Sequence, residues 1–328
     1  MYSIQLIITV VAILLFVTGD ELLFLQAIWR HGDRSPIQSC KGHPIQAQQW
    51  PQGNGQLTVE GMAQMIKLGK IIYSRYSDLL NFLSPYYNAS QIYVRSTDYN
   101  RTLLSAMANF IGFYNNPFLK ERIGIDFPNI TEWPRGLITV PVHTVPDETD
   151  YIGNPDANCP RQKWLLKIMQ RTPEWKSLAE NYTEVLKQLE AICDESLDLN
   201  DIWYCADTFY CEFNQRTGKF QKVHAFDTPV DDLLYDQVQQ LNNAIQNYEN
   251  GLNLQSFDGI DFKHEIGKIR GGSTLWSMLN HFDLKLHCLK PENQKNENCT
   301  WMKNLKYYAY SAVSETPYFQ SLYLKLRC

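Results

Sequence analysis

The chain has no excess of basic residues. Its 30 Lys and Arg side chains are outnumbered by 35 Asp and Glu side chains, which gives a formal net charge of -5 at pH 7. The basic residues are also scattered along the sequence, whereas a nucleic-acid-binding domain carries a basic cluster. This composition argues against nucleic acid as a partner. Any electrostatic attraction of phosphate would have to come from a few basic residues close to the binding site.

Long apolar stretches are absent after the N-terminus. Residues 4–17 form the one long apolar run, and small residues follow it up to Gly19. The run is shorter than the roughly 20 residues that cross a membrane, so we predict a signal peptide over residues 1–19, cleaved near Gly19. An uncleaved N-terminal anchor is the alternative. After cleavage we expect no stable membrane span.

Zinc-finger spacing is also absent, so the cysteines predict no metal site. Their even number fits an oxidising compartment, in which disulfides persist. The intervals between Cys205 and Cys211 and between Cys288 and Cys299 are short enough to close local loops. The eight cysteines are Cys40, Cys159, Cys193, Cys205, Cys211, Cys288, Cys299 and Cys328.

Four glycosylation sequons point to the secretory pathway, and we expect a fifth, at Asn100, to lie in a packed helix start and to stay unmodified. We therefore predict a glycoprotein that is secreted or lysosomal, and the sequence leaves the choice between these destinations open. The acceptor residues are Asn88, Asn129, Asn181 and Asn298.

The chain shows no internal repeat or low-complexity run, and its pattern is one of strands followed by helices. The apolar run 22–28 predicts a buried strand, and residues 62–75 follow it with helical spacing. A second strand over 91–94 precedes a helix over 102–113, and 307–312 reads as a last buried strand. Consecutive strand–helix units favour a mostly parallel sheet flanked by helices, so the predicted fold class is α/β.

Helical patterns dominate the middle of the chain. We predict a single domain over residues 20–328, with a smaller helical lobe inserted at about 117–260. With 44% hydrophobic residues, the 328-residue chain can bury a large core. The expected middle helices cover 164–169, 175–192 and 230–248, and a further helix covers 269–282.

The heptapeptide Arg30-His31-Gly32-Asp33-Arg34-Ser35-Pro36 stands at the end of the first predicted strand. A neutral histidine is a competent nucleophile toward phosphorus, and flanking arginines can bind phosphate oxygens bidentately. These cations disfavour imidazolium, which would keep His31 neutral at acidic pH. Open α/β sheets bind ligands at this end of their strands. A purely structural ion-pair cluster is the alternative.

The motif resembles the signature of the histidine acid phosphatases, the branch of the histidine phosphatase superfamily that includes the prostatic and lysosomal acid phosphatases. Further segments resemble the same family in the expected order, and together they cover residues 22 to about 312. These segments are 55–61, 94–102, 141–144, 159–161, 271–272 and 310–312.

The resemblance implies a phosphoglycerate mutase-like fold and hydrolysis of phosphate monoesters at acidic pH. It makes His31 the nucleophile that becomes phosphorylated, with Arg30, Arg34 and Arg95 as phosphate ligands. Three guanidiniums supply the positive charge in that scheme, so we expect no metal and no other cofactor. The oligomeric state stays open, with a homodimer as one option.

The chain departs from the family after the last predicted strand. Family members have a His-Asp pair there, in which the His binds phosphate and the Asp protonates the leaving oxygen. This chain has Val313 and Ser314 at those positions, and Glu315 follows as a candidate acid. The alternative function is therefore a catalytically impaired secreted glycoprotein that keeps the phosphate pocket.

The ending also differs in length, because only sixteen residues follow Ala312. We expect a divergent, truncated C-terminus in place of the family's further strands and cysteines. The resemblance implies that Cys159 and Cys193 normally pair with cysteines in that segment. A third possibility is that a chain without these elements does not fold stably.

Other polar residues have structural interpretations. Asp98 is predicted to cap the helix that follows the second strand, where the helix dipole favours a carboxylate. His281 and the other histidines outside the motif have no partners at motif spacing, so we assign them no chemistry.

Overall fold

The computed structural model describes residues 22–117, 119–217 and 230–313. The predicted signal peptide over 1–19 lies outside the described residues, as do Ser314, Glu315 and Cys328. Across the described part of the chain, no helix is both long and apolar enough to cross a membrane.

The chain divides into two compact units. Unit 1 has its described residues within 22–32, 59–157 and 273–313, and unit 2 has them within 33–58 and 158–272. The limits of about 117–260 for the helical lobe stay a prediction.

The described residues of unit 1 form a three-stranded parallel sheet. Its strands are β1 (Leu25–Arg30), β2 (Ile92–Ser96) and β3 (Tyr307–Ala312), in the order β1-β3-β2. Both pairings with β3 are parallel, which confirms the predicted α/β class. All three strands therefore end at the same edge of the sheet.

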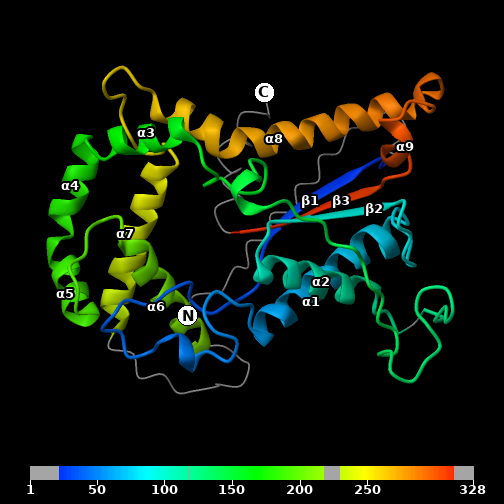
Figure 1. The fold of residues 1–328 in the computed structure, drawn as a ribbon, viewed down its shortest axis with the longest axis horizontal. Coiled ribbons are helices and arrows are strands. Elements are labelled where there is room, and N and C mark those ends of the chain that lie inside the picture. Colours follow the sequence, from blue (N-terminus) through cyan, green and yellow to red (C-terminus); the bar gives the residue numbers. More distant parts are fainter. Residues whose placement is uncertain (1–21, 118, 218–229, 314–328) are drawn as a thin grey trace. The chain divides into compact units, whose positions relative to one another are not determined.

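Helices cover both faces of the sheet (Figure 1). One face packs against α1 (Val59–Tyr73), which continues into a π-helical turn at Ser74–Leu79, and against α2 (Asn100–Tyr114). The other face packs against the last part of α8 (Phe262–Leu289) and α9 (Cys299–Met302). Burial on both faces explains why the strands read as continuous apolar runs.

Two glycines allow α1 and α2 to pack closely. A Cβ at Gly69 would collide with the backbone carbonyl of Asn109, and one at Gly112 would collide with the carbonyl of Ile66. These positions favour glycine because the two helix backbones approach too closely for a side chain.

The helix cap predicted at Asp98 is wrong, since α2 has Tyr99 as its N-cap with no capping side chain.

Unit 2 is mainly helical, and its described residues form one large apolar cluster and a small one of Ile45, Trp50 and Cys211. The helices of unit 2 are α3 (Pro160–Met169), α4 (Pro173–Asn181), α5 (Thr183–Cys193), α6 (Ile202–Thr217) and α7 (Asp232–Glu249). The predicted helix over 175–192 is two helices, α4 and α5, which are separated at Tyr182. No predicted segment covers α6. Short 3-10 turns lie at Ala47–Gln49 in this unit, and at Asp147–Thr149 and Pro291–Asn293 in unit 1.

The disulfides agree only partly with the expected pairing. Cys288 and Cys299 close the predicted local loop. Cys205 and Cys211 do not, because both lie on α6. Cys193 pairs with Cys40, 153 residues away, which corrects the expectation that it needs a cysteine from a further C-terminal segment.

The contact between α1 and α2 makes Gly69→Ala destabilising. The new Cβ would meet backbone, which cannot rotate away, so we expect the free energy of unfolding to fall by about 2 kcal/mol. Gly267→Ala in α8 is the matched control, because nothing lies within 4 Å of its Cβ position. Alanine should be neutral or stabilising there, by up to about 1 kcal/mol. Urea titration measures both, and equal stabilities for the two variants would contradict the close packing.

Candidate functional site

The carboxyl edge of the sheet in unit 1 carries the first half of the sequence motif. Arg30 ends β1 with an exposed side chain, in register with Ala312 of β3. His31 follows, and its backbone N–H donates to the Ala312 carbonyl over 3.0 Å. The His31 residue is only 4% exposed. The pairing with β3 therefore fixes a buried imidazole where β1 ends.

The His31 ring lies against a backbone carbonyl. Its Nδ1 is 2.8 Å from the Gly32 oxygen. A carbonyl oxygen only accepts hydrogen bonds, so Nδ1 carries the proton, and in a neutral ring the lone pair is then on Nε2. In this tautomer Nε2, and not Nδ1, carries the lone pair of the ring.

Gly32 fixes the loop that begins at the histidine. A Cβ at this position would collide with the backbone of Gly61 in α1. The Gly32 N–H donates to Oγ of Ser105 in α2 over 3.1 Å. Both helices under the sheet therefore hold the backbone beside His31. Sequence reasoning missed Ser105, which looks like any small residue on a helix face.

Arg95 reaches the same edge from β2. Its backbone is in register with Tyr310 of β3, and its side chain is 16% exposed. One terminal nitrogen, Nη2, donates to Oδ1 of Asp150 over 2.5 Å. The sheet thus brings Arg30, His31 and Arg95 to one edge, with one strand between the two arginines. No motif or spacing in the sequence indicates that Asp150 pairs with Arg95.

Arg34 belongs to unit 2 and has a different partner. Its Nη1 and Nη2 donate to the two carboxylate oxygens of Asp207 in α6, over 2.9 and 2.7 Å. Its Nη1 also donates to the Ser35 carbonyl over 3.0 Å. This bidentate pair fixes the guanidinium plane. Nothing in the sequence marks Asp207, since it stands 173 residues from Arg34.

The position after β3 is apolar. Val313 is 5% exposed and offers no side-chain hydrogen bond. Glu315, the candidate acid, lies outside the described residues, and so does Ser314. The structure therefore shows a buried apolar residue at position 313, and the match of this position with the family's histidine stays a prediction.

A buried histidine lies near Arg95 on the face of the sheet that packs against α8. Nδ1 of His281, in α8, forms a hydrogen bond with the Tyr310 hydroxyl over 3.1 Å. The His281 ring packs on the Tyr308 ring, with 4.5 Å between the ring centroids. Burial, together with the positive charge of Arg95, lowers the pKa of His281 to about 4. This histidine is therefore neutral over most of the acidic range.

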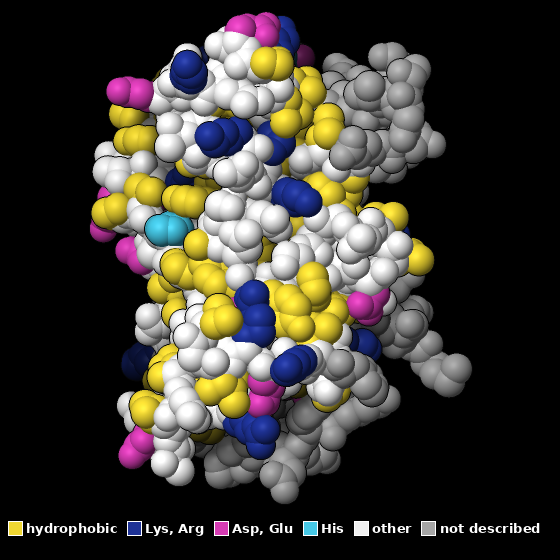
Figure 2. Space-filling view, turned by 90° about the vertical axis from the view of Figure 1, so that its right-hand side faces the viewer, with side chains coloured by type: hydrophobic (Ala, Val, Ile, Leu, Met, Phe, Trp, Pro, Cys, Tyr) yellow, Lys and Arg dark blue, Asp and Glu magenta, His cyan; other side chains and the backbone are white. Residues whose placement is uncertain are grey.

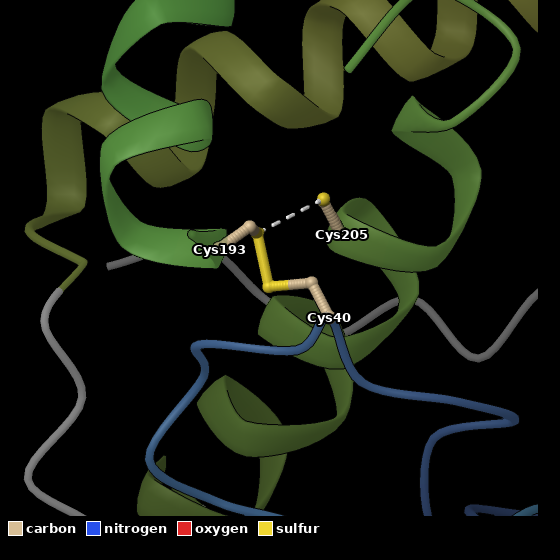
Figure 3. Close-up of side chains that lie close together, drawn as sticks. All are labelled: Cys40, Cys193 and Cys205. Atoms are coloured by element: carbon tan, nitrogen blue, oxygen red, sulfur yellow. Dashed lines mark hydrogen bonds between the residues drawn. A yellow bond between two sulfur atoms is a disulfide. The ribbon is translucent and has the colours of Figure 1, made fainter. Parts of the chain in front are cut away.

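One cysteine group among the described residues has the compactness of a metal site (Figure 3). Cys40, Cys193 and Cys205 lie in unit 2, with 3.8 Å between Sγ of Cys193 and Sγ of Cys205. Cys40 and Cys193 are already joined as a disulfide, which leaves one thiol to act as a ligand. Burial raises the pKa of that thiol, on Cys205, to about 12. The chemistry of this donor set does not fit a thiolate metal site.

On the face that Figure 2 shows, Lys and Arg side chains lie among polar, acidic and apolar groups. This agrees with the scattered basic residues of the sequence.

The buried state of His281 predicts an acid-dependent loss of stability. Between its ordinary pKa of 6.5 and the folded value of about 4, the unfolded chain binds a proton that the folded histidine does not. The free energy of unfolding should therefore fall as the pH is lowered through this window. His281→Gln should flatten the fall, whereas His264→Gln, at a histidine whose side chain is 69% exposed, should not. Melting temperatures between pH 7 and 4.5 measure this, and identical slopes in both variants would refute it.

Known proteins resemble the chain over most of its length. The model of the histidine phosphatase superfamily (branch 2) matches residues 21–316. Prostatic acid phosphatase of Bos taurus is 36% identical over 270 residues, which are 81% of this chain and 62% of that protein. Lysosomal acid phosphatase of Homo sapiens is 38% identical over 197 residues, which are 58% of this chain and 43% of that protein. The matches thus span under two thirds of both relatives.

A solved structure confirms the fold. The phytase of Klebsiella sp ASR1 has a TM-score of 0.56 and 16% identity, and the match covers 90% of this chain and 70% of the phytase. At this identity the likeness concerns the fold alone. With the family model matching residues 21–316, the chain belongs to branch 2 of the histidine phosphatase superfamily.

Proposed function

We propose that this chain is an acid phosphatase, a phosphoric monoester hydrolase that works through a phosphohistidine on His31. The observation that carries the proposal is the buried His31 ring at the carboxyl edge, with Nδ1 held by the Gly32 carbonyl. The relatives named acid phosphatase support the same reaction class. The substrates are phosphate monoesters.

The reaction has two displacements at phosphorus. The Nε2 lone pair of His31 forms a bond to phosphorus while the bond from phosphorus to the ester oxygen breaks, and that oxygen takes up a proton as the alcohol leaves. Water then attacks the phosphohistidine, the bond between phosphorus and nitrogen breaks, and phosphate and neutral His31 result.

The arginines stabilise the charge that develops on the phosphoryl oxygens. Arg30 and Arg95 lie at the same sheet edge as His31, and Arg34 follows it by three residues in the chain. Guanidinium groups bind phosphate oxygens through paired N–H donors, and such donors lower the barrier when they are already oriented.

A second candidate is a phosphate-binding glycoprotein with impaired catalysis. Val313 motivates it, because an apolar side chain at 5% exposure replaces the family's phosphate-binding histidine. Both candidates place the protein in the secretory pathway, either secreted or lysosomal, with glycosylation at the four sequons.

The first test is hydrolysis of p-nitrophenyl phosphate at acidic pH by the purified chain. His31→Ala should abolish activity because the proposed mechanism transfers the phosphoryl group to His31. His264→Ala is the matched control at an exposed histidine and should keep wild-type rates. Equal activity in His31→Ala and the wild type would overturn the proposal. A folded but inactive wild type that binds inorganic phosphate would favour the second candidate.

The second test is the dependence on the leaving group. General acid catalysis typically contributes about 10²- to 10⁴-fold, and a nitrophenolate leaves without it. We expect aryl phosphates to be cleaved at least about 100-fold faster than alkyl phosphates, with the double substitution Val313→His and Ser314→Asp narrowing the gap. Equal aryl and alkyl rates would contradict the loss of the acid. Glu315→Gln would then show whether Glu315 supplies the proton.

A further inference from the structure

Asp150 is a buried carboxylate with a fixed orientation. It follows the 3-10 turn Asp147–Thr149, and its side chain is 1% exposed. Its Oδ1 accepts from the backbone N–H of Ile152 over 3.2 Å and of Gly153 over 2.8 Å. The same oxygen accepts from Nη2 of Arg95 over 2.5 Å. Two backbone donors therefore hold the Asp150 carboxylate in addition to its contact with Arg95.

The turn that carries Asp150 is itself packed at the carboxyl edge of the sheet. A Cβ at Gly153 would lie 2.5 Å from Oδ2 of Asp150 and 3.0 Å from Cγ2 of Thr97, the residue after β2. The Thr274 hydroxyl donates to the Ile152 carbonyl and ties the turn to α8. The carboxylate is thus anchored to the same sheet edge as His31.

Asp150 is the one carboxylate that pairs with Arg95 among the described residues. The groups packed near Arg95 on β3 and α8 are neutral in the acidic range. Tyr308 has a pKa raised by burial to about 12, and His281 has a pKa lowered to about 4. The positive charge of Arg95 therefore has a single anionic partner on this part of the sheet.

The two arginine pairs differ in how many donors they use. Arg34 gives both terminal nitrogens to the two oxygens of Asp207. Arg95 gives one terminal nitrogen to one oxygen of Asp150 and also forms a hydrogen bond with the Tyr308 side chain, and a guanidinium has five N–H donors. The contact with Asp150 directs one N–H of the guanidinium, and the donors that these contacts do not use can form a paired contact with an anion.

We propose that Asp150 is a positioning residue that holds the Arg95 guanidinium in the orientation that binds the phosphoryl group. This inference rests on the proposed function, in which Arg95 is a phosphate ligand. It predicts that phosphate binding depends on the acceptor oxygen of Asp150, which orients Arg95, and not on the negative charge of Asp150. A negative charge beside a phosphate site weakens anion binding, so charge and geometry have opposite effects on affinity.

Two substitutions at Asp150 separate these effects. Asp150→Asn removes the charge and keeps an oxygen that can accept from Arg95, so affinity for inorganic phosphate should be unchanged or higher. Asp150→Ala removes the acceptor, so phosphate affinity should fall at least about tenfold and kcat/KM about 10- to 100-fold. The readouts are the inhibition constant of phosphate against p-nitrophenyl phosphate, and the phosphate-induced rise in melting temperature, which needs no turnover.

Asp126 supplies the matched control. It forms a bidentate ion pair with Arg122 in unit 1, at 2.5 and 2.7 Å, outside the site. Asp126→Ala tests what loss of an ion pair does to stability, and it should leave phosphate affinity and kcat/KM unchanged. In an Arg95→Ala background, Asp150→Ala should have no further effect on phosphate affinity, because the two residues act as one unit.

Several results would overturn the inference. Wild-type phosphate affinity in Asp150→Ala would do so, and so would equal losses in Asp150→Asn and Asp150→Ala with native melting temperatures. If Asp150→Ala does not fold, the Asp150→Asn variant tests the inference alone. Weaker phosphate binding by Asp150→Asn than by the wild type would contradict the proposed positioning role. If the wild type hydrolyses the ester and Arg95→Ala is equally active, Arg95 has no role in the reaction and this inference fails with it. A wild type that neither hydrolyses nor binds phosphate removes the proposed function as well.

Discussion

The parallel pairing of β3 with both β1 and β2 is the constraint on which the site depends. Each neighbour is joined to β3 along its length, so the strands end at one edge. The His31 N–H continues the ladder to Ala312, and the Thr97 N–H continues it to Ser311. Two segments far apart in the chain thus present Arg30, His31 and Arg95 together. Covering helices on both faces bury the strands and make this register specific.

Carboxylate partners are the second constraint, because a largely buried guanidinium needs both charge compensation and orientation. The structure gives Arg34 a bidentate partner in Asp207 and gives Arg95 a single-point partner in Asp150. Charge-assisted hydrogen bonds of this kind are stronger than neutral ones and fix the planar guanidinium. In unit 1 the buried His31 ring at the end of β1 and the Arg95–Asp150 pair lie at one edge of the sheet, and in unit 2 Asp207 orients Arg34.

Much of the architecture could be predicted because it follows from local patterns. The sequence pattern predicts the strand 307–312 with its observed ends, and it predicts that the motif at 30–36 stands at the end of a buried strand. Contacts between distant segments had no such signal. Asp150 pairs across 55 residues, Asp207 across 173, and Cys40 with Cys193 across 153. The roles of His31 and the arginines, the lobe limits and the signal peptide stay predictions.

The most direct test of the account is to trap the intermediate. The chain would be mixed with excess p-nitrophenyl phosphate at acidic pH, quenched in alkali, where phosphohistidine survives, and digested for mass spectrometry. The account predicts one phosphoryl group on the peptide that contains His31, attached at the imidazole, and none in His31→Ala. Active enzyme with no phosphorylated peptide, or with the phosphoryl group on another residue, would contradict it.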